Sequence, residues 1–238
     1  MRLNAHKAIP IAAGALLLGL TVAATSSSAG KLGLSKPKQT GPLELAPGAT
    51  LELNGVSTLH PFKARALEMS AGIDFDAARV ALILPPVSVV ALIRGRAIRS
   101  LELTIPVAKL SSGEPGLDEN LRDALKSDRF QEVRFRADSY DLVATPAAGA
   151  AFTVTLHGHL SLAGVERLVD VRADGIQTAD GVRFSGSKDL LMSDFQVKPP
   201  TMMFGTIKTA DLITVKFDVT LKIATTPPGI AGAVVKAR

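Results

Sequence analysis

The 238-residue sequence contains no cysteine. This absence excludes a lipid-modified N-terminal cysteine, a disulfide framework and a thiolate metal site. Aromatic residues are also scarce: they make up 4% of the chain, with no Trp and one Tyr, whereas 47% of the residues are hydrophobic. Sugar-binding clefts and single-stranded nucleic-acid sites use stacked aromatic rings, so the composition disfavours both. An aliphatic composition suits an aliphatic ligand, and it suits an ordinary hydrophobic core as well.

Charge of one sign does not accumulate anywhere in the sequence. The chain has 27 Lys and Arg against 22 Asp and Glu, a net charge of +5, and removal of Arg2 and Lys7 would leave +3. Basic and acidic residues alternate along the chain instead of forming a basic run. We therefore predict no nucleic-acid partner.

The N-terminal segment has the features of a secretory signal peptide. Arg2 and Lys7 form a short basic region, and no charged side chain occurs in residues 8–24, which are rich in Ala, Leu, Ile and Val. The small residues Ser27 and Ala29 stand at positions −3 and −1 of a cleavage after Ala29. This pattern predicts a periplasmic or secreted protein.

From residue 49 onward, apolar and polar residues alternate with a period of two. The clearest run is residues 213–223, where apolar side chains alternate with Thr, Lys and Asp, and residues 101–107, 133–136 and 152–162 share the pattern. Such alternation is typical of antiparallel strands with one buried and one solvent-facing side. Many such strands form either a sandwich or a closed barrel. Because closure removes exposed sheet edges, we predict an all-β, antiparallel β-barrel with one short helix.

Two local features interrupt the alternation. The apolar positions shift by one residue between residues 62–66 and residues 67–75, which predicts a bulge or bend near Ala66. Residues 118–127 carry apolar side chains at helical spacing. We expect a helix there, with Asp118 as its N-cap.

These patterns predict how the chain is divided. We expect a signal peptide at residues 1–29, a flexible Gly-, Pro- and Lys-rich tether at residues 30–48, the barrel at residues 49–224 and a disordered tail at residues 225–238. An uncleaved N-terminal anchor is the alternative to the signal peptide. A membrane span needs about twenty apolar residues, and Pro10 interrupts this segment.

Four stretches, in this order, resemble the YceI-like domain family, whose members are exported and fold as extended lipocalin-like barrels. The stretches are residues 57–62 (STLHPF), residues 116–121 (GLDENL) continuing through Phe130 to Phe135, residues 158–165 (GHLSLAGV), and residues 193–200 (SDFQVKPP) continuing to residues 205–208. The resemblance extends over roughly residues 51–223. It implies an apolar tube inside the barrel, where some members of the family bind a polyisoprenoid chain.

The histidines do not suggest a catalytic or metal site. His157 and His159 are two residues apart on a predicted strand, so they share a face, but no carboxylate or third histidine is spaced to complete a metal site. His60 follows Ser57, yet the hydrolase motif Gly-x-Ser-x-Gly is absent. We expect His60 to bond a backbone carbonyl at a strand bend. We predict no catalytic residue, no metal and no enzyme activity.

Residues 81–93 form an apolar run that contains Pro85 and Pro86 and is followed by Arg94, Arg96 and Arg99. The two prolines exclude a continuous helix or a central strand. One interpretation is a pair of buried strands joined at the prolines. The other is an exposed apolar loop that makes peripheral contact with a membrane beside the arginines.

We predict that the barrel binds a long apolar ligand, an isoprenoid or fatty lipid, without catalysis in the bacterial envelope. The alternatives are a structural or envelope-stress module with a packed interior, and an enzyme that acts on lipids. A barrel of about eight strands either is filled by its side chains or holds one ligand. The side chains predicted to line the ligand site are Leu103, Phe135, Val154, Leu156, Leu160, Val215, Phe217 and Val219.

Overall fold

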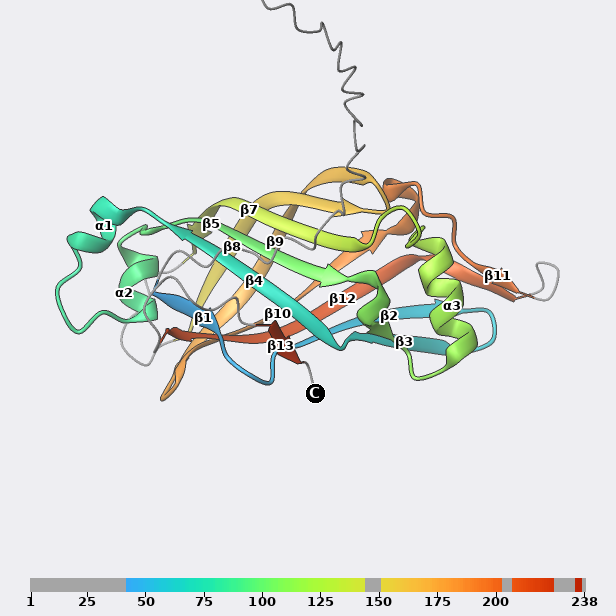
Figure 1. The fold of residues 1–238 in the computed structure, drawn as a ribbon, viewed down its shortest axis with the longest axis horizontal. Coiled ribbons are helices and arrows are strands. Elements are labelled where there is room, and N and C mark those ends of the chain that lie inside the picture. The colour runs from blue at the N-terminus through green and yellow to red at the C-terminus, as the bar shows by residue number, and fades with distance from the viewer. Residues whose placement is uncertain (1–41, 144–150, 203–206, 225–233, 237–238) are drawn as a thin grey trace, which may run out of the picture. The chain divides into compact units, whose positions relative to one another are not determined.

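The computed structural model describes residues 42–143, 151–202, 207–224 and 234–236, which are mostly antiparallel β-strands (Figure 1). The predicted signal peptide and most of the predicted tether lie outside these residues. The elements in chain order are β1 (Leu43–Leu45), β2 (Thr50–Ser57), β3 (Pro61–Ala66), β4 (Glu68–Phe75), α1 (Ala77–Ala81), α2 (Val89–Arg94), β5 (Ile98–Pro106), η1 (Val107–Lys109), β6 (Leu110–Ser111), α3 (Pro115–Ala124), β7 (Glu132–Leu142), β8 (Phe152–Leu162), β9 (Val165–Thr178), β10 (Gly181–Leu191), η2 (Met192–Phe195), β11 (Thr201–Met202), β12 (Ile207–Ile223) and β13 (Val234–Lys236).

The strands form a sheet that curls back on itself into a nearly closed barrel. Neighbouring strands follow the order β4, β5, β7, β8, β9, β10, β12, β2 and β3. Strand β3 pairs with β2 and strand β4 pairs with β5, and the two are separated by Leu67 alone. They are therefore two halves of one bent strand that joins the ends of the sheet. The predicted antiparallel barrel and the predicted bend near Ala66 are both confirmed.

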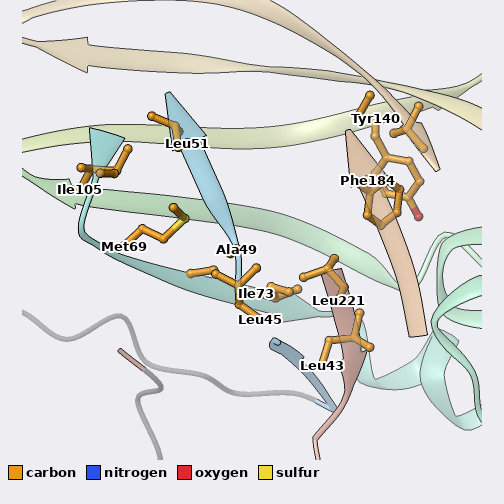
Figure 2. Packing of buried hydrophobic residues seen from close by; sticks show 14 of the residues in the cluster. Leu43, Leu45, Ala49, Leu51, Met69, Ile73, Ile105, Tyr140, Phe184 and Leu221 are labelled. Carbon is orange, nitrogen blue, oxygen red and sulfur yellow. The ribbon is translucent and has the colours of Figure 1, made fainter. Parts of the chain in front are cut away.

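Alternation of side chains along the strands explains how the barrel is held together. In β4, Met69, Ala71, Ile73 and Phe75 are buried, and the residues between them are more exposed. Figure 2 shows Ile73, Leu45 and Leu221 in the same buried cluster, to which β4, β1 and β12 contribute. Burial of each large aliphatic side chain stabilises the fold by about 1.5–3 kcal/mol, which compensates for the absence of disulfides.

The predicted boundaries of the barrel domain are wrong at both ends. Leu43 and Leu45, expected in the flexible tether at residues 30–48, are 0% and 4% exposed, and β1 pairs with residues 221–223 of β12. Val234–Lys236, expected in the disordered tail at residues 225–238, form β13, which pairs with β4. Both strands are three residues long, too short to stand out by periodicity.

The predicted helix at residues 118–127 is displaced, because α3 begins at Pro115 and ends at Ala124. Asp118 is not its N-cap; the N-cap is Glu114, which makes no capping bond with its side chain. Asp118 instead accepts hydrogen bonds from the hydroxyls of Ser111 and Ser112, both at 2.7 Å. Burial raises the pKa of the Asp118 carboxyl, but the bonds from the two serines outweigh it and the pKa lies below its usual value.

The apolar run at residues 81–93 is not a pair of strands but an exposed loop followed by a helix. Leu82 and Leu84, between α1 and α2, are 81% and 85% exposed. The Ser88 side chain then caps α2 by accepting a bond from the N–H of Ala91 (3.1 Å), and α2 buries most of its apolar side chains. Helices α1 and α2 were not predicted, because the sequence stretch is too short and too uniformly apolar to show helical periodicity. No helix in the described part of the chain has the length and hydropathy needed to cross a membrane.

Candidate functional site

The inner faces of the strands surround a cavity of about 310 Å³. Its lining includes Ile93 of α2 and Leu121 of α3, helices that lie toward opposite ends of the barrel (Figure 1). The volume falls within the range of about 300–1,000 Å³ that is typical of small-molecule sites. Nearly all of the lining side chains are aliphatic or aromatic. The cavity is therefore suited to an apolar ligand.

The predicted lining side chains all border this cavity. They are Leu103 of β5, Phe135 of β7, Val154, Leu156 and Leu160 of β8, and Val215, Phe217 and Val219 of β12. Strand pairing places Phe135 opposite Leu160, and Val171 of β9 opposite Leu156. The structure thus places these residues on the inner face, as the period-two alternation predicts, and their contact with a ligand stays a prediction.

Strands β9 and β10 and helix α3 also contribute to the lining, although the sequence pattern did not predict their part in it. Strand β9 lines the cavity with Val169, Val171 and Ala173, which follow the same alternation. That signal was obscured by Leu168, an apolar residue on the outer face that is 76% exposed. Helix α3 contributes Leu121, among others, from its apolar side.

A bulge in β7 turns Tyr140 toward the cavity and α2. The pairing of β7 with β8 shifts between Ala137 and Ser139, so that Tyr140 points inward. The Tyr140 hydroxyl donates a hydrogen bond to the carbonyl of Ile93 at the end of α2 (2.9 Å), and the guanidinium of Arg96 donates to the Tyr140 carbonyl. Burial raises the pKa of the Tyr140 phenol, which keeps it protonated as a donor. The side chain of Tyr140 thus links α2 to strand β7 by a hydrogen bond.

His157 and His159 lie on the outer face of β8, away from the cavity. The His157 ring binds Asp170 of β9 through Nδ1 (2.7 Å) and Asp141 of β7 through Nε2 (3.0 Å). The sequence shows no carboxylate spaced to complete a metal site with these histidines, and the two carboxylates beside His157 come from neighbouring strands. Hydrogen bonds to Asp170 and Asp141 raise the pKa of His157. Both of its ring nitrogens are engaged, and within the described ranges no cluster of three or more His, Asp or Glu is arranged to hold a metal ion.

His60 has the structural surroundings that the sequence predicts. It lies in the exposed turn between β2 and β3, where its Nδ1 is 2.9 Å from the carbonyl oxygen of Pro61. Ser57 is also part of the turn: its hydroxyl donates to the His60 carbonyl (2.9 Å) and accepts from the His60 N–H (3.2 Å). The serine hydroxyl is bound to backbone and is not paired with the imidazole.

A nearly closed antiparallel barrel with an apolar interior cavity defines a lipocalin-like class of protein. Within that class, the family model of the YceI-like domain matches residues 59–221. The match covers more than half of the sequence, so the chain belongs to the YceI-like domain family. Comparison with curated proteins gave no match.

Solved structures show the same fold at low sequence identity. BcnA of Burkholderia cenocepacia is 19% identical, with a TM-score of 0.53 over 73% of this chain and 95% of that chain. A polyisoprenoid binding domain from Saccharophagus degradans, described as implicated in plant cell wall breakdown, is 15% identical, with a TM-score of 0.56 over 77% of this chain and 99% of that chain. At these identities the similarity establishes a shared fold.

Proposed function

We propose that the barrel binds one long apolar chain, an isoprenoid or other lipid, in its interior without catalysing a reaction. The observation that carries this proposal is the cavity of about 310 Å³ with its almost wholly apolar lining. Transfer of aliphatic surface from water into such a site is favourable by about 25 cal/mol per Å². The eight side chains predicted from the sequence, among them Leu156, Leu160 and Phe217, form the proposed contact surface.

The cavity also favours binding over the alternative of a packed, ligand-free barrel. Protein interiors are close-packed and contain few voids larger than a water molecule, which occupies about 30 Å³ in the liquid. A cavity of about 310 Å³ is far larger than such a void. The name of the Saccharophagus degradans domain supports an isoprenoid as the ligand.

The enzyme alternative has less support from the cavity. None of the described lining side chains is a His, Asp or Glu, the residue types that most often transfer protons in catalysis. His157 and His60 lie outside the lining, and their ring nitrogens bond to carboxylates and to a backbone carbonyl respectively. We infer a binding role for the interior.

Native mass spectrometry with a defined apolar chain tests the proposed function. Protein purified and stripped of lipid by organic extraction, then refolded and incubated with geranylgeraniol, should gain the mass of one ligand per chain. A protein that gains no ligand mass and melts at the same temperature with and without the ligand would contradict the proposal.

We also propose that the chain is exported and that residues 1–29 are removed. The support is the basic region, the uncharged stretch and the small residues before Gly30. Protein from the cell envelope should begin near Gly30 or Lys31 when its N-terminus is sequenced. Protein that begins at Met1 would favour an anchor.

The loop at residues 82–88 is the surface that we propose for peripheral membrane contact. Leu82 and Leu84 are exposed at the start of this loop, and Arg79 and Arg94 lie on the flanking helices. Apolar side chains beside arginines suit the headgroup region of an anionic bilayer. Partial burial of two leucines contributes roughly 1.4 kcal/mol, which corresponds to about a tenfold change in affinity.

The double variant Leu82→Asp, Leu84→Asp should therefore have an affinity for phosphatidylglycerol vesicles about tenfold lower than the wild type, as measured by the fraction of protein that sediments with the vesicles. Leu168→Asp is the matched control, since Leu168 is 76% exposed on the barrel wall and far from the loop in sequence. The control should bind vesicles as the wild type does. Equal sedimentation of all three proteins would exclude the loop as the contact surface.

A further inference from the structure

One inner position of β10 carries a charge. Strand β10 alternates so that Val182 and Phe184 are buried on the inner face, and Lys188 and Leu190 continue that face. Lys188 pairs with Val215 of β12, and both side chains line the cavity. An apolar residue would complete the pattern, so the lysine is an exception that needs a physical reason.

No carboxylate of the protein neutralises this lysine within the described chain. The charged residues among the described lining are Lys188 and Arg99, and Arg99 has a partner in Asp74 (3.8 Å). Asp189 follows Lys188 in sequence but points to the outer face, where it accepts a hydrogen bond from Thr214 (2.6 Å). Within the described ranges no Asp or Glu oxygen lies within 4.0 Å of the Lys188 ammonium.

Two other lysines of the barrel have such partners, whereas exposed lysines on its outer surface, such as Lys63 and Lys216, have none in the described chain and remain hydrated. Lys109 lies 2.8 Å from Glu68, and Lys222 lies 3.1 Å from Glu44. Lys188 is half-buried, and the part of a cation that packs on an apolar wall loses hydration, which is unfavourable unless an anion pairs with it. A ligand that brings its own anion into the cavity would provide this pairing.

The position of Lys188 also determines how such a ligand would lie. Strand β10 starts at the α2 end, and Lys188 is near its other end, where Leu191 lines the cavity and is 41% exposed. Toward the α2 end the wall is apolar, with Phe184 beside Phe152. A charged head at Lys188 would thus lie near the surface, and the tail would extend toward Ile93.

We propose that Lys188 binds the anionic head, a carboxylate or phosphate monoester, of an amphiphile whose tail fills the cavity. This inference rests on the proposed function and specifies the chemical class of the ligand. A charge-assisted hydrogen bond from an ammonium to a carboxylate is stronger than one to a neutral oxygen. The barrel should therefore prefer an acid over the alcohol or ester of the same chain.

The test measures the affinities of oleate, oleyl alcohol and methyl oleate by displacement of a fluorescent apolar probe from the full chain. In the wild type the ratio of the Kd for oleyl alcohol to the Kd for oleate should be about ten, because the charge-assisted bond favours the acid. Lys188→Met, which keeps the length of the side chain without its charge, should lower this ratio about tenfold. Lys188→Arg should retain most of the ratio. Lys216→Met is the matched control, because Lys216 is exposed on the outer face of the neighbouring strand, and it should leave the ratio unchanged.

Each outcome decides a different point. If the ratio of the two Kd values is the same in Lys188→Met and in the wild type, Lys188 does not bind the head of the ligand. Binding of oleyl alcohol by both proteins would still support the proposed function in that case. An equal loss of affinity for oleate and methyl oleate in Lys188→Met would show that the lysine donates to a neutral oxygen, which would overturn the anionic head. Failure of all three ligands to bind the wild type would refute the proposed function itself.

Discussion

Replacement of Leu156 with Trp should abolish lipid binding and leave the melting temperature close to that of the wild type. Leu156 is partly buried on the inner face of β8 and borders the cavity between Tyr140 and Val171 of the neighbouring strands. An indole at this position would enter the empty volume and occupy the place of the ligand. The hydrogen bonds of the strand ladder lie in the sheet and would remain intact.

A packed interior would give the opposite result. Overpacking of a filled core costs about 1–3 kcal/mol, and a domain of this size loses about 2–4 °C of melting temperature per kcal/mol. Native mass spectrometry and thermal melts of the wild type and Leu156→Trp distinguish the two cases. Leu168→Trp is the matched control, since it makes the same substitution on the outer face of β9, and it should retain the ligand. A ligand-free wild type with a destabilised Leu156→Trp variant would refute lipid binding.

The inner face of the barrel could be predicted because alternation along a strand is a local property. Once residues 152–162 and 213–223 are recognised as strands, each apolar position is assigned to the same side without knowledge of the partner strands. The bend near Ala66 was predictable for the same reason, since the change in alternation occurs within a few residues. Register did not have to be known for either prediction.

Features that depend on pairing between distant segments could not be predicted in this way. Asp141 and Asp170 meet His157 only because β7 and β9 lie on either side of β8. Asp118 has the residue type of a helix cap, but Ser111 at the end of β6 and the adjacent Ser112 provide its hydrogen bonds. The inward Lys188 could have been found from the alternation of β10, had that strand been assigned.

The bulge in β7 depends on a glycine in the adjacent strand. Gly158 of β8 is buried opposite Ala137, next to the point where the register shifts. A Cβ atom on Gly158 would lie 2.1 Å from the carbonyl oxygen of Arg136 and 2.7 Å from the Cα of Ala137. Both atoms belong to the backbone of β7, so no change of side-chain rotamer can relieve the contact. The two strands would have to move apart at the bulge that turns Tyr140 inward.

Gly158→Ala should therefore destabilise the fold by about 1–3 kcal/mol, the cost of forcing an extra carbon into a packed region. Gly116→Ala is the matched control, because no atom lies within 4 Å of the position of its Cβ in α3. Alanine there should stabilise the helix by about 0.5–1 kcal/mol. Urea unfolding of both variants and the wild type measures these differences.

If strand separation loosens the bond between Tyr140 and Ile93, amide exchange in α2 should also accelerate in Gly158→Ala alone. If Gly158→Ala is as stable as the wild type, β7 can shift at the bulge without a loss in the free energy of unfolding.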